Sequence, residues 1–289
     1  MATRNEGLSI EQAYCDARKK FREAGLETPD MDAALLLEHV CGATTIDRMT
    51  APEKRITPSQ SDTFAAFVER RLLREPVHRI MGEREFYGLT LGLNEATLIP
   101  RPDTEILVEM ALPFVHERIA LNGTCSILDL GTGTGAVALA ILNQAPLATA
   151  TATDLEPRAL EMAAQNAERY QLQNRFSTIQ SNWFENVSER YDLIISNPPY
   201  IVSKVINDLD VDVRDYDPML ALDGGDDGLN AYRIIASQAA AYLKSGGRIA
   251  VEIGFDQKTS ISALFNQADF TTLEAKNDLS GNNRALFFT

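Results

Sequence analysis

The sequence has few of the residues that disulfide frameworks and metal sites require. Its 289 residues include three cysteines, which lie far apart without metal-ligand spacing, and three histidines with no partner pattern for a triad or a metal. No run of about 18 apolar residues occurs, so no membrane-spanning helix is expected. We therefore expect reduced thiols, no bound metal and no membrane partner. The residues concerned are Cys15, Cys41, Cys125, His39, His78 and His116.

Positive charge is also scarce. The chain has 27 Lys and Arg against 41 Asp and Glu, a net charge of -14 and a pI near 4.7. Extended binding to nucleic-acid phosphates depends on Lys and Arg, so this balance disfavours stable nucleic-acid binding and favours a protein partner. Residues 1–6 lack the apolar core of a signal peptide. Together with the reduced thiols, this predicts a cytoplasmic protein.

Residues 1–78 are predicted to form a small helical domain. Ser9 and Gln12 make a capping box, a second helix is expected over 32–41, and Pro58 stands at the first position of a further helix. Apolar residues recur between these signals at helical spacing, which is typical of helices that pack into a bundle.

The rest of the chain predicts two further parts. Residues 79–100 alternate and contain glycines, as a β-hairpin does, and we interpret them as the link between domains. Residues 101–289 alternate short apolar runs with helical stretches, which predicts a doubly wound α/β domain with a mostly parallel sheet. Its seven expected strands are Ser126 to Leu130, Ala148 to Thr153, Phe176 to Gln180, Leu193 to Ser196, Gly247 to Ile253, Thr271 to Ala275 and Arg284 to Phe288.

A glycine-rich turn follows the first of these strands, in the segment Asp129-Leu130-Gly131-Thr132-Gly133-Thr134-Gly135. Glycines there allow a tight turn and the close approach of a ligand. The spacing is G-x-G-x-G, and the following helix has no further glycine or basic residue suited to phosphates, which favours a nucleoside without phosphates. Asp129 could orient this loop, lie near a cationic part of the ligand, or cap the turn.

An acidic residue, Asp154, ends the second strand about 20 residues after the turn. A carboxylate in this place can accept both hydroxyls of a ribose. The alternative is a solvated carboxylate before the helix that begins near Pro157. The glycine turn beside it favours the ribose.

A polar motif, Asn197-Pro198-Pro199-Tyr200, follows the apolar strand 193–196. Ligands of open α/β sheets bind at the carboxyl ends of strands, so polar residues there need an explanation beyond packing. The Asn197 side-chain oxygen and the Pro198 carbonyl are two acceptors that match the two donors of a planar NH2 group. Tyr200 either forms a wall of this site or packs in the core. The motif predicts chemistry on an amide or exocyclic amino nitrogen, although a turn that only ends the strand is the alternative.

Together with further segments, these motifs resemble the HemK/PrmC family of methyltransferases. The combination is specific even though each segment alone is not. The matching segments are Glu85 to Gly88, Leu98 to Glu105, Asp129 to Gly135, Ser196 to Ile201, Ala221 to Leu229 and Glu252 to Gly254.

The resemblance implies a fold, a reaction and a partner. The fold would be the seven-stranded class I S-adenosylmethionine methyltransferase domain. The reaction would methylate the glutamine of the Gly-Gly-Gln loop in class I peptide chain release factors, a protein substrate, with S-adenosyl-L-methionine converted to S-adenosyl-L-homocysteine. The N-terminal helices would then dock and position that substrate. Asp103 and Tyr216-Asp217-Pro218 depart from the usual family text, which affects loop geometry and leaves the turn and the motif intact.

The resemblance also implies roles for individual residues. The turn from Gly131 through Thr132, Gly133 and Thr134 to Gly135 would face the cofactor. Asp154 would bind its ribose, Trp183 would lie near its adenine, and Asn197 would border it. Asn197, Pro198, Pro199 and Tyr200 would hold the substrate glutamine, with Asn197, Pro198 and Tyr200 as the catalytic set.

Methyl transfer to an amide is then mainly a positioning problem, because the methyl donor is already activated. As the new C–N bond forms, the nitrogen becomes positive and its protons more acidic. Two acceptors therefore bind the transition state more strongly than the ground state. A rival function is an adenine amino methyltransferase acting on nucleic acid, since an exocyclic NH2 poses the same recognition problem.

For some residues the sequence leaves two possible roles open. Arg101 could reach the cofactor or substrate region, or pair with Asp103 or Glu105. Phe86 and Tyr87 could border the substrate or be buried at the domain junction. Asp223, Asp226 and Asp227 are interpreted as a polar loop and not as metal ligands.

Overall fold

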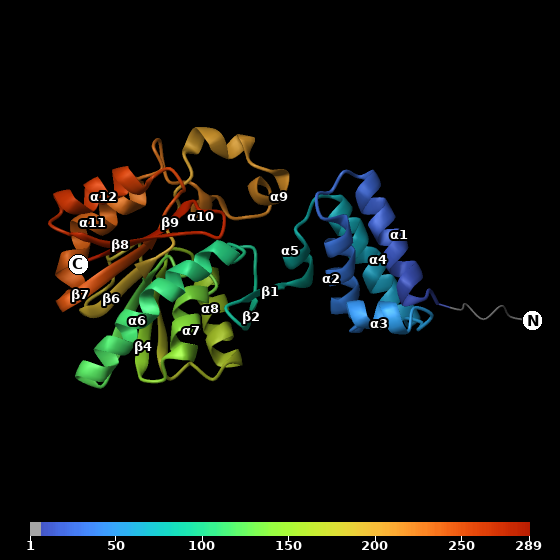
Figure 1. The fold of residues 1–289 in the computed structure, drawn as a ribbon, viewed down its shortest axis with the longest axis horizontal. Coiled ribbons are helices and arrows are strands. Elements are labelled where there is room, and N and C mark those ends of the chain that lie inside the picture. The colour runs from blue at the N-terminus through green and yellow to red at the C-terminus, as the bar shows by residue number, and fades with distance from the viewer. Residues whose placement is uncertain (1–6) are drawn as a thin grey trace, which may run out of the picture. The chain divides into compact units, whose positions relative to one another are not determined.

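The computed structural model describes residues 7–289, and Figure 1 shows the fold. The expectation about a missing signal peptide concerns residues 1–6 and lies outside the described part. The chain divides into two compact units, Met1–Gly82 with Val211–Tyr216 and Glu83–Asp210 with Asp217–Thr289. The smaller unit therefore ends four residues later than the sequence boundary at 78 and includes a distant segment.

The smaller unit is helical, and its helices begin where the sequence signals lie. Ser9 caps the first helix in a full capping box with Gln12, and Thr57 does the same for the helix that starts at Pro58. The second helix begins at Pro29, three residues before the expected Asp32. The helices are α1 (Ile10–Glu23), α2 (Pro29–Cys41), α3 (Thr45–Thr50), α4 (Pro58–Leu72), α5 (Val77–Met81) and α9 (Val211–Arg214).

This unit has its own apolar core and one buried ion pair. Phe21, Leu36 and Leu37 are fully buried in it. Arg71 Nε donates to Asp32 Oδ2 at 2.7 Å, and both side chains are less than 8% exposed. A buried guanidinium must be paired in this way because leaving it alone in the core costs several kcal/mol (about 3 to 5).

The larger unit contains a seven-stranded sheet in the order β5-β4-β3-β6-β7-β9-β8. β3, β4, β5, β6 and β7 pair in parallel, and β9 joins β7 antiparallel. All seven expected strands are confirmed, with ends that differ by a few residues. They are β3 (Cys125–Leu130), β4 (Ala148–Asp154), β5 (Phe176–Gln180), β6 (Tyr191–Ser196), β7 (Leu243–Glu252), β8 (Thr272–Asn277) and β9 (Asn283–Phe288).

A separate antiparallel hairpin, β1 (Glu83–Phe86) with β2 (Leu89–Gly92), precedes this sheet. It belongs to the larger unit, where its Phe86, Leu89 and Leu91 are buried in the same cluster as the helix that follows. The β-hairpin expected within residues 79–100 is thus present, and its apolar side chains pack within one unit.

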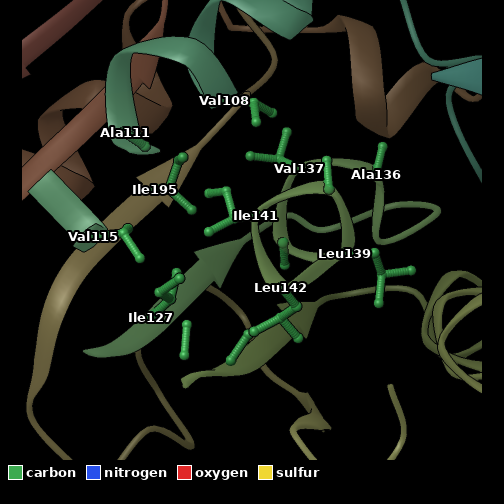
Figure 2. Close-up of a cluster of buried hydrophobic side chains, with 14 of the residues drawn as sticks. Val108, Ala111, Val115, Ile127, Ala136, Val137, Leu139, Ile141, Leu142 and Ile195 are labelled. Carbon is green, nitrogen blue, oxygen red and sulfur yellow. The ribbon is translucent and has the colours of Figure 1, made fainter. Parts of the chain in front are cut away.

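Helices cover both faces of the sheet, as a doubly wound fold requires. α6 (Glu105–Asn122), α7 (Ala136–Gln144) and α8 (Pro157–Arg169) contact one face, and α11 (Asn230–Tyr242) and α12 (Lys258–Gln267) the other. Figure 2 shows the first face, where Val108 and Val115 of α6 and Ile141 of α7 surround Ile127 and Ile195 of β3 and β6. Short elements η1 (Pro102–Thr104), η2 (Ser203–Asp208) and α10 (Met219–Leu222) lie in the loops.

The strand order reverses between β3 and β6, which is where such sheets bind ligands. After β3 the chain builds outward through β4 and β5, and it then returns to place β6 on the other side of β3. The glycine turn, Asp154 and Asn197 therefore all lie at the same edge. Within residues 7–289, no helix has the length and apolar character needed to cross a bilayer.

Candidate functional site

A cavity of about 350 Å³ lies at this edge of the sheet. Its walls come from the loops after β3, β4, β5 and β6 and from the segment before α6. The predicted site residues on its walls are Gly131, Thr132, Gly133, Thr134, Asp154, Trp183, Asn197 and Pro199, while Gly135, Pro198 and Tyr200 are not among them.

The glycine turn is held in a fixed conformation by the neighbouring strand. Gly131 and Gly133 have φ of 71° and 55°, in the left-handed region that glycine adopts at low cost. The N–H groups of Gly131 and Thr132 both donate to the Thr153 carbonyl at 2.9 Å. Gly135 lies at the start of α7, where a Cβ would come within 3.0 Å of Leu139. The last glycine therefore serves the packing of α7, and the earlier ones shape the cavity wall.

Asp129 is buried beneath the turn and organises it. Its carboxylate accepts a hydrogen bond from the Thr132 hydroxyl at 2.7 Å. Burial raises its pKa to about 7, although the Thr132 bond works in the other direction. Of the three roles considered for Asp129, this contact supports both orientation of the loop and capping of the turn. The carboxylate also lies on the cavity wall.

Asp154 faces the cavity from the end of β4 and also holds the turn. Its Oδ2 accepts from the Gly133 N–H at 2.9 Å, and its Oδ1 accepts from the Glu156 N–H at 3.0 Å. Burial raises its pKa. Each carboxylate oxygen keeps a further lone pair for a ligand hydroxyl. The freely solvated carboxylate considered as an alternative is therefore not what this position contains.

Trp183 forms another part of the wall, in the loop after β5. Its φ is 55°, which is rare for a bulky residue and strains the backbone. Such strain persists where the surroundings fix it, and it is common at ligand sites. The indole also packs against the apolar cluster of the α11 and α12 face. The position is consistent with a flat surface offered to an aromatic ring.

Asn197 lies on the cavity wall directly after β6. Its Nδ2 donates to the Thr104 Oγ1 at 3.3 Å. Since the two ends of an amide point in different directions, this leaves Oδ1 free of Thr104. Tyr200 instead turns its hydroxyl toward Glu252 Oε1, 3.5 Å away, and its ring packs against the apolar cluster. Burial raises the pKa of Tyr200 to about 12.

The backbone of the Asn-Pro-Pro-Tyr motif is clamped by the glycine-rich loop at 221–229. Ile201 N–H donates to the Leu222 carbonyl at 3.0 Å, and Gly224 N–H donates back to Ile201 at 2.8 Å. A Cβ on Gly224 would lie 2.8 Å from Tyr200 Cα and 2.9 Å from the Pro199 carbonyl oxygen. This close approach explains why the loop at 221–229 needs a glycine where it packs against the motif.

Arg101 does not pair with either of the two partners expected for it. Its guanidinium contacts Asp217 Oδ2 at 2.8 Å, where the Asp217 side chain is fully buried. Asp103 pairs instead with Arg284 at 3.2 Å, and Glu105 accepts the Tyr87 N–H at 2.9 Å. Contacts between residues more than 100 positions apart cannot be read from local spacing. Arg101 nevertheless lies on the cavity wall.

The remaining candidates are now placed. Phe86 is buried in the core of the larger unit, and Tyr87 packs partly buried against it. Asp223 accepts from the Ser203 hydroxyl at 2.6 Å and from Gly225 N–H at 2.9 Å, which ties the loop internally. Asp227 pairs with Arg233. Within residues 7–289, no cluster of His, Cys, Asp and Glu could hold a metal.

Two polar residues beside the motif were not singled out from the sequence. Thr104 lies on the cavity wall, and Glu252 is buried behind it at the end of β7. Both fall within segments of the family resemblance, which was the only signal available for them.

Two family models match the chain, and solved structures share its fold. The models are the PrmC N-terminal domain, over residues 12–82, and the methyltransferase small domain, over residues 110–212. The hMettl16 catalytic domain, solved in complex with an RNA hairpin, has a TM-score of 0.54 at 16% identity, with 79% of this chain and 82% of that chain covered. A methyltransferase from Pyrococcus furiosus has a TM-score of 0.52 at 19% identity, with 76% and 96% covered. The fold and the site thus define a methyltransferase of the seven-stranded α/β class.

Curated relatives narrow this class. A release factor glutamine methyltransferase from Agrobacterium fabrum is 49% identical over 272 residues, which cover 94% of each chain. One from Caulobacter vibrioides is 39% identical over 280 residues, which cover 96% of each chain. The chain belongs to the family of release factor glutamine methyltransferases.

Proposed function

We propose that this chain uses S-adenosyl-L-methionine to methylate the side-chain amide nitrogen of the Gly-Gly-Gln glutamine in class I release factors. The observation that carries the proposal is the Asn197 amide. Its nitrogen is turned to Thr104, which leaves its oxygen as an acceptor at the cavity wall. An acceptor there suits a substrate NH2 group, and the curated relatives are named for glutamine methylation.

The cavity walls offer groups that suit a nucleoside. Both arginines on these walls are already paired, Arg101 with Asp217 and Arg158 with Glu95. Neither arginine therefore offers a free guanidinium to a phosphate group. Asp154 supplies a carboxylate for ribose hydroxyls, and Trp183 supplies an aromatic surface for a base. These groups support S-adenosyl-L-methionine as the cofactor.

S-Adenosyl-L-methionine, when bound, supplies a methyl group activated on a sulfonium. The residues of this chain then have to bind and orient the glutamine. The Asn197 oxygen, at the cavity wall, accepts one N–H bond of the amide. The carbonyl of the next residue, Pro198, which does not itself line the wall, accepts the other, and together they fix the plane of the NH2 group. The amide nitrogen gains one methyl group and loses one proton in the reaction.

Acceptor pairing also favours the transition state. The amide nitrogen becomes positive as its new bond forms, so its N–H groups become better donors. The Asn197 and Pro198 oxygens therefore bind the transition state more strongly than the substrate. Fixed acceptors need no reorganisation at that moment, and the cavity keeps them partly shielded from water.

The rival function, methylation of an adenine amino group in nucleic acid, has weaker support. The chain carries a net charge of -14, which opposes binding to a phosphate backbone. The resemblance to an RNA-bound methyltransferase is at 16% identity and concerns the fold. The curated relatives at 39 to 49% identity are named for release factor glutamine.

A direct comparison of substrates tests the proposal. The wild-type protein would be incubated with S-adenosyl-L-methionine carrying a labelled methyl group and either a purified class I release factor or DNA and RNA oligonucleotides. We expect label on the release factor alone. Label on the oligonucleotides and none on the factor would transfer the assignment to the adenine amino methyltransferase.

A further inference from the structure

A chain of buried polar side chains lies behind Asn197. Asn197 Nδ2 donates to Thr104 Oγ1 at 3.3 Å. The Thr104 hydroxyl in turn acts on the Glu252 carboxylate and lowers its pKa. Glu252 Oε1 is 3.5 Å from the Tyr200 hydroxyl. The four residues come from the end of β6 and the motif after it, from η1, and from β7. Two members of the substrate motif are thereby joined through one carboxyl group.

Glu252 is an unusual residue to bury. It is 2% exposed, and its Oε2 has no hydrogen-bond partner among residues 7–289. Burial of a carboxylate with incomplete pairing costs free energy, so such groups in native proteins call for a reason. Glu252 is absent from the cavity wall, whereas Thr104 and Asn197 are on it. A direct contact between Glu252 and a substrate is therefore not the reason.

The direction of the hydrogen bonds suggests why Glu252 is buried there. An ionised carboxylate only accepts, so in any hydrogen bond between the two groups the Thr104 hydroxyl is the donor and Glu252 the acceptor. The single Thr104 proton is then used, and the Thr104 oxygen can only accept from Asn197. The nitrogen end of the Asn197 amide must therefore face Thr104, and its oxygen end must face the cavity.

We propose that Glu252 is a positioning residue that fixes the orientation of the Asn197 amide through Thr104 and holds the Tyr200 ring through its hydroxyl. The inference rests on the proposed function, in which Asn197 accepts from the substrate NH2 group. With the Asn197 amide reversed, its own NH2 group would face the substrate NH2 group, donor against donor. The Glu252 carboxylate selects the productive orientation.

The groups around Glu252 set its pKa, and the orientation of the Asn197 amide therefore depends on whether Glu252 is protonated. Burial raises the pKa of Glu252 to about 7, and Asp103 raises it further, while Thr104, Arg284 and Tyr200 act to lower it. Tyr232 donates its hydroxyl to the Glu252 main-chain oxygen at 2.8 Å. A protonated Glu252 can donate to Thr104, which frees the Thr104 proton for the wrong end of the amide. The productive orientation is therefore lost as the pH falls below about 7.

The kinetic test separates orientation from packing. Thr104→Val keeps the shape and removes the hydroxyl, and we expect kcat on a Gly-Gly-Gln peptide to fall about 10- to 100-fold, as a misplaced binding group does. Cofactor affinity should stay within about twofold, and Thr104→Ser should restore most of kcat. Equal kcat for wild type and Thr104→Val would overturn the proposal.

The pH readout uses Glu252→Gln, which has nearly the same shape and cannot ionise. We expect the ratio of wild-type to variant kcat to rise between about pH 6 and pH 8. Asp129 is common to both proteins, so its titration cancels in the ratio. A ratio independent of pH would contradict the role assigned to the carboxylate.

A spectroscopic readout does not depend on turnover. With asparagine 15N-labelled, the side-chain NH2 signal of Asn197 is identified by its loss in Asn197→Asp. We expect that signal to move in Thr104→Val and in Glu252→Gln, and an unmoved signal in both would overturn the network. A wild-type protein that transfers no methyl group to the peptide, while the signal still moves, would instead contradict the proposed function alone.

Discussion

Some side chains at the cavity make hydrogen bonds within the protein and also face the space where a ligand would bind. Asp154 accepts from Gly133 and Glu156 while it lies on the cavity wall, and Asp129 does so with Thr132. A carboxylate has about four lone-pair sites, so both tasks are possible at once. Substitutions at these residues should therefore affect cofactor binding more than the fold.

Asp154→Asn tests whether the Asp154 carboxylate binds the ribose of the cofactor. The variant keeps one acceptor oxygen but loses the charge and replaces the other oxygen by a donor. We expect affinity for S-adenosyl-L-homocysteine to fall about 10- to 100-fold, in line with about 1.5 to 3 kcal/mol for a hydrogen bond to a charged group. Isothermal titration calorimetry measures this. Asp62→Asn on the exposed surface of α4 is the control, and equal affinity in both variants would contradict the role.

Gly224→Ala tests the clamp on the substrate motif. The added Cβ would come within 2.9 Å of Tyr200 Cα and of the Pro199 carbonyl oxygen, so the motif backbone must shift. We expect kcat on a Gly-Gly-Gln peptide to fall at least about tenfold. Gly123→Ala, at the C-terminal end of α6 with φ 79°, is the control. It should lower the melting temperature with little change in kcat, and a similar kcat loss in both variants would refute the clamp.

The residues with local signals could be predicted, and those defined by distant contacts could not. The glycine turn, Asp154 and Asn197 each follow a strand, so their place at one edge of the sheet follows from the strand pattern. The contact of Arg101 with Asp217 and that of Thr104 with Asn197 join positions 116 and 93 residues apart. No local spacing encodes such pairs, which depend on how the loops fold.

Elements were predictable where caps and apolar runs agree. The strands of the sheet are short apolar runs, and the helices that start at Ile10 and Pro58 follow capping boxes. α2 begins at Pro29 and not at Asp32 because a proline fits the first turn of a helix, where its missing N–H costs nothing. The place of α9 in the smaller unit could not be foreseen, since the partners of its Asp212 lie 141 and 138 residues earlier in the chain.

Asp192 on β6 links this strand to β3, β7 and α6 through its carboxylate. Its carboxylate accepts from Ser126 N–H of β3 at 2.9 Å, from Arg118 of α6 at 2.8 Å and from Lys244 of β7 at 3.0 Å. Burial raises the pKa of Asp192, but these hydrogen bonds outweigh it and lower the pKa from 3.8 to about 2. Its contribution to stability is therefore complete above about pH 4 and is lost as the pH falls toward 2.

Asp192→Asn should lower the free energy of unfolding at neutral pH by about 1.5 to 3 kcal/mol, because the half-buried Arg118 loses its charged partner. The Lys244 side chain is 42% exposed, so solvent screens its pairing and it adds little. The variant should also lose part of the acid dependence that the wild type shows between about pH 4 and pH 2. Urea unfolding at a series of pH values measures both. A constant difference between the two proteins across that range would show that Asp192 does not titrate as described.

At the scale of the whole molecule, the chain returns to the smaller unit after the substrate motif. Residues 211–216 belong to that unit, where Asp212 accepts from Arg71 at 2.7 Å and from Arg74 at 2.8 Å. The chain then re-enters the larger unit at Asp217, and Pro218 already lies on the cavity wall. The Asp212 ion pairs therefore hold residues 211–216 within the smaller unit.

We expect Asp212→Ala to weaken the use of a folded substrate. If the smaller unit positions the release factor, loosening this restraint should raise KM for the intact factor several-fold and leave KM for a Gly-Gly-Gln peptide within about twofold. Asp215→Ala is the matched control, since Asp215 lies in the same segment and pairs only with the adjacent Arg214 in the ion pairs of the described chain. An equal change of KM for peptide and factor would place the effect in the cavity instead.

We propose that the cavity positions a glutamine amide for methylation through Asn197. The most direct measurement is peptide mass analysis of a class I release factor after reaction with S-adenosyl-L-methionine. We predict a gain of one methyl group on the Gly-Gly-Gln glutamine, absent when that glutamine is alanine and absent with Asn197→Ala. A methyl group on another residue of the factor, or undiminished transfer by Asn197→Ala, would contradict the account.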